Sequence, residues 1–151
     1  MKIRRYKSED FKEIADLFYN TVHSINIKDY TEEQVNVWAT GKLDYEKWNK
    51  SLEEHFSLVA IENEVIIGFG DIDDTGYLDR LYVHKDYQGR GVGTYICNEL
   101  EVKCKTKNFL VHASITSKPF FEGRGYRVVK EQEVERNSIK LKNFIMKKEN
   151  N

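Results

Sequence analysis

The sequence predicts one domain of the α/β class, in the α+β arrangement, with a mixed central sheet of about seven strands flanked by helices. Across the 151 residues, the hydrophobic period changes from helical spacing to strand alternation at Phe56. In Gly76–Lys105 a strand, a glycine-rich loop and a long helix follow one another. The next strand, Phe109–Ser114, takes the place of the second parallel strand in a crossover unit. We expect the domain to span residues 1–147, followed by a polar tail at 148–151.

The region before the main strands is predicted to be helical. After a short strand at Lys2–Tyr6, Ser8 is the expected N-cap of a helix that ends near Ser24. Thr31–Gln34 has the spacing of a capping box, in which the first and last side chains each bond a free backbone N–H. Asp44 is the expected cap of a further short helix. These helices either cover one face of the sheet or line a substrate pocket.

The rest of the chain is predicted to contain the sheet and its crossover helices. Strict alternation along the third strand of a meander places Asp79 on the same face as Leu81 and Val83. The meander strands are Phe56–Glu62, Val65–Asp73 and Tyr77–Val83. The elements expected after them are a helix at Gly91–Lys105, a strand at Phe109–Ser114, a short helix at Thr116–Gly123, and a hairpin of Tyr126–Glu135 and Ser138–Lys147 that turns at Arg136-Asn137.

Composition and charge indicate an ordinary globular protein. The 24 Lys and Arg residues nearly balance the 25 Asp and Glu residues, so we expect no nucleic-acid partner. No apolar run approaches the ~18 residues of a membrane span, and the first residues lack the apolar core of a signal peptide. We therefore expect a cytoplasmic protein with no membrane partner. Cys97 and Cys104 lie roughly 10 Å apart along one helix, too far for a disulfide, and we expect structural thiols and no metal site.

Three glycines lie in the five residues from Gly89 to Gly93, between the third meander strand and the next helix. A backbone without Cβ atoms turns tightly and lets a ligand approach closely. The first N–H groups of the helix have no partner inside the helix, and the positive end of the helix dipole lies there. The loop therefore predicts an anion site, most simply for a phosphate.

Two common nucleotide-binding loops do not fit this spacing. A Walker loop continues with Lys and Ser or Thr, whereas Gly93 is followed by Thr94 and Tyr95. A dinucleotide fingerprint, GxGxxG, needs a further glycine at position 94 or 96, and these positions hold Thr94 and Ile96. That fingerprint also follows the first strand of its unit, not a meander. A nucleoside triphosphatase and a dinucleotide-binding enzyme are therefore disfavoured.

The loop and its flanks resemble the GNAT superfamily of acyl-CoA N-acyltransferases. The family's central motif, Gln/Arg-x-x-Gly-x-Gly/Ala between a strand and a helix, is matched by Gln88, Gly91 and Gly93. Leu81–Tyr87 is similar to the family's central strand, and Phe120–Tyr126 is similar to its short helix ending in Tyr-Glu-x-x-Gly-Phe. The expected order of elements agrees with the family over nearly all of the chain. The resemblance implies the GNAT fold, with a V-shaped split in the sheet after the central strand.

The resemblance implies that acetyl-CoA is the cofactor, with its diphosphate on the backbone N–H groups of residues 89–94 and its thioester in the split. Arg90 either adds a charged contact to that diphosphate or is a solvated loop residue. The backbone N–H of Val83 is the expected donor to the carbonyl oxygen of the thioester. The residues expected to bind the cofactor are Leu81, Tyr82, Val83, Gln88, Gly89, Arg90, Gly91, Val92, Gly93, Thr94, Ser114, Ser117, Phe120 and Phe121.

Transfer of an acetyl group to an amine requires a neutral amine and a protonated leaving thiol. An amine with a pKa of about 10.4 must lose a proton at a pH ~3.4 units below that pKa, which is unfavourable at pH 7. A thiol with a pKa of about 8.5 lies only ~1.5 units above pH 7, so the difference between its two protonation states is smaller. A base is therefore needed more than an acid. Asp79 is the first candidate base, although a structural strand carboxylate is an equal alternative, and His84 is the second candidate.

The general acid is where the sequence departs from the family. The family's frequent tyrosine falls at Phe121, which has no proton to donate. The family's frequent asparagine falls at Ser114, which we count as the third catalytic candidate because its hydroxyl still forms hydrogen bonds. Ser117 and Tyr126 carry the other nearby hydroxyl groups. The acid is therefore another group or a water, or it is absent.

Two functions are consistent with these residues. The first is an N-acetyltransferase that moves an acetyl group from acetyl-CoA to a primary amine of a small molecule or protein by direct attack. The second, kept open by Phe121, is a catalytically weak coenzyme A-binding regulatory or interaction domain. Tyr30, Trp38 and Asp79 are the expected acceptor-binding residues, in a monomer or a homodimer.

Overall fold

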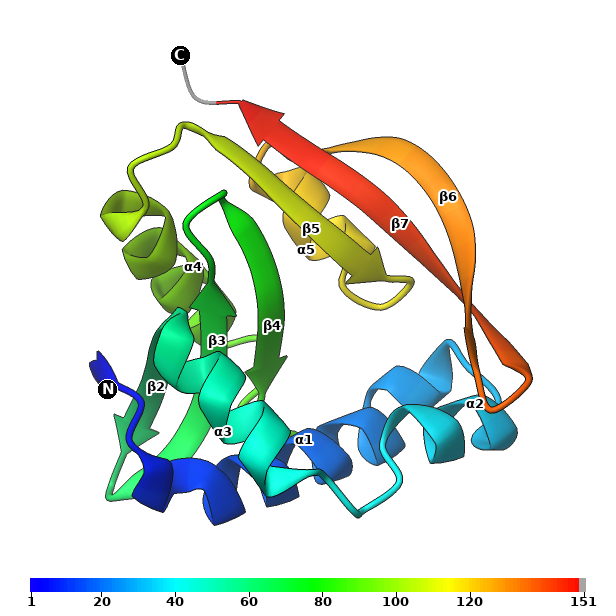
Figure 1. The fold of residues 1–151 in the computed structure, drawn as a ribbon, viewed down its shortest axis with the longest axis horizontal. Helices are drawn as coiled ribbons and strands as arrows, with labels where there is room; N and C mark the ends of the chain where they lie inside the picture. Colours follow the sequence, from blue (N-terminus) through cyan, green and yellow to red (C-terminus); the bar gives the residue numbers. More distant parts are fainter. Residues whose placement is uncertain (150–151) are drawn as a thin grey trace.

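The computed structural model describes residues 1–149 and contains a mixed sheet of seven strands. The strands are β1 (Lys2–Arg5), β2 (Phe56–Glu62), β3 (Val65–Ile72), β4 (Tyr77–Val83), β5 (Asn108–Ser114), β6 (Arg127–Arg136) and β7 (Ile139–Glu149). Their order across the sheet is β1-β2-β3-β4-β5-β7-β6 (Figure 1). The pair β4–β5 is parallel and the other neighbouring pairs are antiparallel. This sheet confirms the predicted fold class.

Helices cover both faces of the sheet, and each face has its own hydrophobic cluster. On one face, Ile96 and Phe121 from two helices pack against Leu78 of β4. On the other face, Phe18 and Val35 pack against Phe69 of β3. The helices of the first face are α4 (Val92–Lys103) and α5 (Lys118–Gly123), and those of the second are α1 (Phe11–Ser24), α2 (Glu32–Trp38) and α3 (Tyr45–Glu54), with 3₁₀ turns η1 (Ser8–Asp10) and η2 (Asn26–Lys28).

The sheet opens between β4 and β5. These strands pair only where Tyr77 meets Leu110 and Leu78 meets Val111, at the beginning of β4. Beyond this point the two strands diverge, as Figure 1 shows, so that within residues 1–149 the rest of β4 has no strand partner on this side. The V-shaped split expected after the central strand is confirmed.

A β-bulge in β4 changes which side chains share a face. Asp71 of β3 pairs with Arg80 and the next residue of β3 pairs with Leu78, so Asp79 is the extra residue. Leu78 and Leu81 both belong to the cluster on the α4 face. The carboxylate of Asp79 instead lies 3.4 Å from the guanidinium of Arg80, which packs toward α3. The prediction that Asp79 shares a face with Leu81 is therefore wrong, because a bulge interrupts the alternation.

The caps expected at α2 and α3 are confirmed, whereas the first helix is capped differently and α5 begins at Lys118, two residues after the expected Thr116. Thr31 and Gln34 each bond the other's backbone N–H, as a capping box requires, and Asp44 bonds a backbone N–H in the first turn of α3. Ser8 is not a cap, because it lies inside η1. The carboxylate of Asp10 supplies the hydrogen bond at this end instead, to the backbone N–H of the residue before η1.

The C-terminal hairpin turns one residue later than expected. Asn137 and Ser138 have φ angles of 48° and 67°, as a two-residue hairpin turn requires. Arg136 is therefore the last residue of β6 and not a turn residue. The expected tail also begins too early, since β7 continues to Glu149, and the final two residues of that tail lie outside the described part of the chain.

Both cysteines are free, as the spacing predicted. Cys97 lies on the buried face of α4, and the thiol of Cys104 lies 3.7 Å from the carbonyl oxygen of Asp73. Across residues 1–149, no helix combines the length and the apolar character that a membrane crossing requires.

Candidate active site

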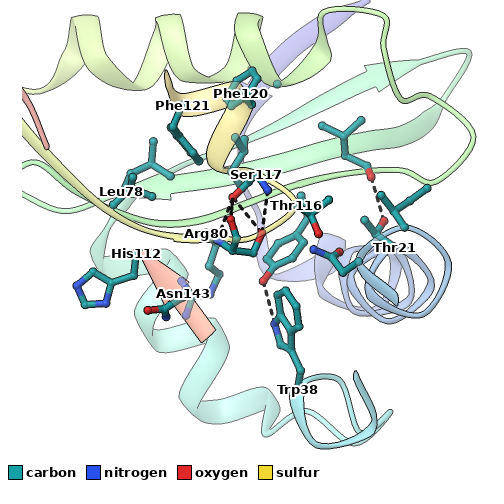
Figure 2. A pocket seen from close by; sticks show the side chains of 18 of the residues that line it. Thr21, Trp38, Leu78, Arg80, His112, Thr116, Ser117, Phe120, Phe121 and Asn143 are labelled. Atoms are coloured by element: carbon teal, nitrogen blue, oxygen red, sulfur yellow. Dashed lines mark hydrogen bonds between the residues drawn. The ribbon is translucent and has the colours of Figure 1, made fainter. Parts of the chain in front are cut away.

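A cavity of about 620 Å³ occupies the split between β4 and β5 (Figure 2). The glycine loop and the start of α4 form one end, the facing edges of β4 and β5 form the middle, and Tyr30 and Trp38 lie at the other end. Of the residues that the sequence assigns to the cofactor, the acceptor or catalysis, all but Arg90 and His84 line this cavity. The structure therefore brings the two ends of the predicted site into one space.

The two remaining residues point elsewhere. The guanidinium of Arg90 lies over the ring of Tyr87, 5.1 Å from its centroid. The Nδ1 atom of His84 accepts a hydrogen bond of 3.0 Å from the backbone N–H of Asp86, in the turn that follows β4. In this arrangement neither side chain contacts the cavity, and their predicted roles remain predictions.

The anion end of the cavity is made of backbone. Gly91, the residue before α4, has a φ of 81°, in the left-handed region that favours glycine. No side chain caps α4, so the N–H groups of its first turn are left for a ligand. A Cβ atom at Gly89 would meet nothing within 4 Å, so this side of the loop is open to a ligand. The loop has the geometry of the predicted phosphate site.

The edge of β4 that faces the split carries free backbone donors. The N–H of His84 donates to the carbonyl oxygen of Ile67 on β3, at 2.8 Å. In an antiparallel pair alternate residues point their N–H groups to opposite sides, so those of Leu81 and Val83 point into the split. A bound group that runs along β4 meets these two donors.

Two side chains hold the end of β4 in place. The hydroxyl of Thr21 on α1 and the amide of Gln88 both donate to the carbonyl oxygen of Val83, at 3.0 and 2.7 Å. Gln88 lines the cavity, but its amide group is engaged with the strand. The first residue of the motif therefore fixes the glycine loop to the end of β4.

Ser114 and Ser117 form a closed pair where β5 ends and α5 begins. Their hydroxyl oxygens lie 3.0 Å apart, and each accepts a hydrogen bond of 3.0 Å from the backbone N–H of the other residue. The hydroxyl proton of Ser117 has only a long contact, 3.5 Å, to the carbonyl oxygen of Ser114. That proton is available to a ligand in the cavity.

Phe121 and Tyr126 pack together in the core beside the cavity. The side chain of Phe121 lines the cavity and packs edge-on against Phe120 and Tyr126, with ring centroids 5.1 Å apart in both pairs. The hydroxyl of Tyr126 donates to Glu101 at 2.8 Å, and burial raises the pKa of Tyr126 far above its usual value. Tyr126 is therefore engaged away from the cavity and offers no proton to it.

The other end of the cavity is aromatic. Trp38 donates its indole N–H to the hydroxyl oxygen of Tyr82, at 3.2 Å (Figure 2). Burial raises the pKa of Tyr82 to about 12, so this hydroxyl keeps its own proton at neutral pH. The hydroxyl of Tyr30 donates to the carbonyl oxygen of Lys142 and accepts from the N–H of Ile115, at 2.7 and 2.9 Å. Tyr30 therefore joins β7 to the end of β5 while its ring walls the cavity.

A group of charged side chains lies behind the bulge. The carboxylate of Asp79 is at the cavity wall, 3.4 Å from the guanidinium of Arg80 and 3.9 Å from Nδ1 of His55. Asp71 is fully buried and contacts the same two groups more closely, at 2.6 and 2.7 Å. Of this group, Asp79 and Arg80 line the cavity, whereas Asp71 and His55 do not.

Asn143 is a site residue that the sequence reading missed. It lies on β7 opposite Ser114, and Figure 2 shows its side chain among those that line the cavity. Its Oδ1 atom is buried and has no hydrogen-bond partner among residues 1–149. The sequence contained one sign of this position: strand alternation places the amide side chain of Asn143 on the same face as the apolar Leu141 and Ile145. Arg136, which the hairpin shift moves onto β6, also lines the cavity.

Comparison with known proteins identifies the family. Residues 26–149 match the model of the acetyltransferase (GNAT) domain. The chain belongs to the GNAT acetyltransferase family. It is 33% identical over 147 residues to the uncharacterised N-acetyltransferase YafP of Escherichia coli (strain K12), a match that covers 97% of this chain and 95% of YafP.

Solved GNAT structures have the same fold. A GCN5-related N-acetyltransferase from Rhodopseudomonas palustris has a TM-score of 0.93 and 32% identity, and the match covers 98% of this chain and 94% of that one. The PaiA N-acetyltransferase of Thermoplasma acidophilum, solved in complex with coenzyme A, has a TM-score of 0.78 and 21% identity, covering 99% and 98% of the two chains.

The GNAT family uses acetyl-CoA, and related structures have been solved with coenzyme A or acetyl-CoA bound. The residues of this chain fit that cofactor at two places: the uncapped start of α4 suits a diphosphate, and the free N–H groups of Leu81 and Val83 suit a chain that contains amides. The phenol that GNAT enzymes frequently carry on α5 is missing, because Phe121 takes its place.

Proposed function

We propose that this GNAT acetyltransferase moves the acetyl group of acetyl-CoA to a primary amine of a small molecule or a protein by direct attack. One observation carries the proposal. The bulge in β4 sets the carboxylate of Asp79 at the cavity wall, two residues before the free N–H of Leu81. A proton acceptor and a donor for a developing oxyanion thus come from the same strand.

Asp79 is the proposed proton acceptor. An amine with a pKa of about 10.4 arrives as an ammonium ion, and its deprotonation at pH 7 costs roughly 4.6 kcal/mol. The carboxylate attracts this ammonium and receives its proton, directly or through a water. A positioned base of this kind typically contributes about 10²–10⁴-fold to the rate.

The N–H groups of Leu81 and Val83 are the proposed donors to the reacting carbonyl oxygen. Acetyl-CoA supplies the thioester, and the carbonyl oxygen of a thioester gains charge as an amine attacks it. Both N–H groups are already fixed by β4 and need no reorganisation. Val83 was the expected donor, and Leu81 is the donor closer to Asp79 along the strand. Thr21 and Gln88 support this function by holding the carbonyl group of Val83.

The leaving thiol is proposed to gain its proton from water or from a hydroxyl of the cavity wall. Phe121 has no proton to give, and Tyr126 bonds Glu101 in the core. The hydroxyl protons of Ser117 and Tyr82 remain as donors. Protonation of a thiolate with a pKa of about 8.5 is favourable at pH 7, so a weak acid slows the reaction without abolishing it.

The acceptor is proposed to enter at the aromatic end, between Tyr30 and Trp38. At this end the unpartnered Oδ1 of Asn143 is a hydrogen-bond acceptor for an N–H of the incoming amine. Asn143 and Asp79 together offer two hydrogen-bond acceptors to the ammonium group of a primary amine, which carries three N–H donors. This arrangement favours a primary amine over a tertiary amine, which has a single N–H when protonated.

The experiment is thiol release from acetyl-CoA with a panel of primary amines, using the wild-type protein, Asp79→Asn and the control Asp74→Asn. Asp74 is an exposed carboxylate in the turn before β4, away from the cavity. We expect Asp79→Asn to lower the rate about 10²–10⁴-fold with unchanged affinity for acetyl-CoA, and Asp74→Asn to leave both unchanged. Tight binding of coenzyme A with no amine ever acetylated would contradict the enzyme and favour a binding domain.

A further inference from the structure

A charge cluster around the buried Asp71 connects the cavity wall with His55, the residue that follows α3. Its members are the carboxylates of Asp71 and Asp79, the guanidinium of Arg80 and the imidazole of His55. Asp71 connects the cluster, because its Oδ2 atom accepts hydrogen bonds from both Arg80 and His55, at 2.6 and 2.7 Å. Arg80 is fixed further by Ser51 at 3.0 Å. The imidazole therefore has a defined position next to the proposed base.

The cluster does not have the electrostatics of a metal site. Ligand atoms of His55, Asp71 and Asp79 lie within 4.8 Å of one another, which is compatible with a cation in distance alone. However, the guanidinium of Arg80 already occupies the shared oxygen of Asp71 and lies 3.4 Å from Asp79. A divalent ion at this point would be repelled by a permanent positive charge. The cations that balance the two carboxylates are Arg80 and His55.

The charge of this cluster depends on one ionisable group in the neutral pH range. With His55 protonated, two carboxylates face two cations, and with His55 neutral one negative charge is in excess. An imidazole is the side chain whose ordinary pKa lies closest to neutral pH, and the hydrogen bond to Asp71 raises the pKa of His55 above that value. Burial raises the pKa of Asp71, although the bonds from His55 and Arg80 oppose that effect. The charged groups that face His55 are Asp71 on β3, Asp73 in the following turn, and Asp79 and Arg80 on β4.

We propose that His55, held by Asp71, is a positioning residue that sets the strength of Asp79 as a proton acceptor. When His55 is protonated, a positive charge 3.9 Å from Asp79 stabilises its carboxylate and weakens it as a base. When His55 is neutral, the excess negative charge attracts the acceptor ammonium and strengthens Asp79. This inference rests on the proposed function, since it assigns a control to the same base.

The exposure of the two side chains fits this role. The side chain of Asp79 is 31% exposed, at the cavity wall, while that of His55 is 21% exposed and does not line the cavity. His55 therefore exchanges protons with water without touching the acceptor. Because His55 lies outside the cavity, a bound substrate does not cover the imidazole, and His55 can still gain or lose a proton as the pH of the solution changes. The expected consequence is a transfer rate that rises with pH through the pKa of His55.

The first test measures the electrostatic coupling without any turnover. The imidazole signals of His55 are followed by NMR as a function of pH in the wild-type protein, in Asp79→Asn and in Asp86→Asn. Asp86 is an exposed carboxylate in the loop after β4. Asp86→Asn therefore removes one negative charge, as Asp79→Asn does, but at a position outside the charge cluster. We expect Asp79→Asn to lower the pKa of His55 and Asp86→Asn to leave it unchanged. Identical titrations of His55 in the wild type and Asp79→Asn would overturn the proposal.

The second test is the pH profile of kcat/KM in His55→Gln and His55→Lys. We expect kcat/KM of the wild type to fall, as pH is lowered through the pKa of His55, from a higher level to a lower plateau. His55→Gln, which is always neutral, should remove this acid limb, and His55→Lys, which is always charged, should be slow throughout. His23→Gln removes an imidazole that bonds Ala39 on the far side of α1, and it should keep the wild-type profile.

The outcomes separate the two proposals. If wild type and His55→Gln have the same profile, the role of His55 is wrong while the transferase stands. If no amine is acetylated, the proposed function fails, and the NMR titrations still decide whether His55 and Asp79 are coupled. A stable His55→Gln protein with normal acetyl-CoA affinity and a changed pH profile would support control of the base over a purely structural role.

Discussion

The two ends of the cavity are built from different parts of the chain. At the end assigned to the cofactor, the available hydrogen-bond donors are backbone N–H groups of the glycine loop, of α4 and of β4. They come from residues that are nearly contiguous in sequence. At the acceptor end, side chains arrive from separate elements: Tyr30 from the segment before α2, Asp79 from a bulge, and Asn143 from β7. The first end is suited to a constant ligand, and the second is free to change with the acceptor.

The difference predicts which substitutions affect which ligand. A change of backbone conformation at the loop should weaken acetyl-CoA and leave the acceptor end intact. A change of side chain at the acceptor end should do the reverse. A variant that alters both affinities equally would show that the two ends are not separable.

The largest expected effect on ligand affinity is at Gly91. Replacement by valine forces a β-branched residue into the left-handed region, at a cost of about 1–2 kcal/mol, and narrows the approach to the start of α4. We expect at least a tenfold (~1.4 kcal/mol) loss of affinity for acetyl-CoA in calorimetry. Gly125→Val is the control, because its φ of 91° gives the same strain away from the cavity. Equal losses in the two variants would mean that Gly91 acts only through stability.

The next effect is at the acceptor end. Asn143→Leu removes the unpartnered Oδ1, whose burial costs about 1–3 kcal/mol, so the protein should unfold at a higher temperature. The same change removes a hydrogen bond to the amine, and the KM of the acceptor should rise about fivefold, the equivalent of ~1 kcal/mol. Affinity for acetyl-CoA should not change. A lower melting temperature with an unchanged KM would place Asn143 in the fold and not in the site.

A smaller effect is expected between the two ends, at Phe121. Phe121→Tyr adds the phenol that relatives frequently carry, and we expect the transfer rate to stay equal or to rise. The control is Phe109→Tyr, which buries a hydroxyl in the same core away from the cavity and should destabilise the protein by roughly 1–3 kcal/mol without changing the rate. A large loss of activity in Phe121→Tyr would show that the shape of phenylalanine is required.

The smallest effect concerns stability and pH. The folded pKa of His55 is raised by its bond to Asp71, so its stabilising contribution is complete below the unfolded pKa, near 6.5, and is lost as pH rises through the folded pKa. The difference in unfolding free energy between wild type and His55→Gln, measured with urea, should therefore be larger at pH 5.5 than at pH 8.5. A difference that grows with rising pH would contradict the assigned ion pair.

The sequence predicts the glycine loop and the strand and helix beside it because local rules determine them. Glycine spacing, the strand before it and the helix after it are all visible in Gly76–Lys105, and the split follows from the family resemblance. The capping residues Thr31 and Asp44 are equally local, and they are confirmed.

The acceptor end could not be predicted in the same way. No local pattern marks the bulge at Asp79, because it depends on how β4 pairs with β3. Arg136 and Asn143 lie in a hairpin whose register depends on the position of its turn. A shift of the turn by one residue moves every side chain of a strand to the opposite face of the sheet. His55 joins the site through Asp71 on β3, the strand beside β4, and through its contact of 3.9 Å with Asp79.

The free edge of β4 also bears on how long the protein survives in a cell. Within residues 1–149, β4 and β5 pair across the split only at Tyr77 and Leu78, so the unpaired part of the β4 edge should open early to hydrogen exchange and proteases. A cofactor that fills the gap bridges the arms, and at a hundred times its dissociation constant it adds about 2.7 kcal/mol against unfolding. The abundance of the protein should then follow the acyl-CoA supply, so that a starved cell clears it sooner than a fed one.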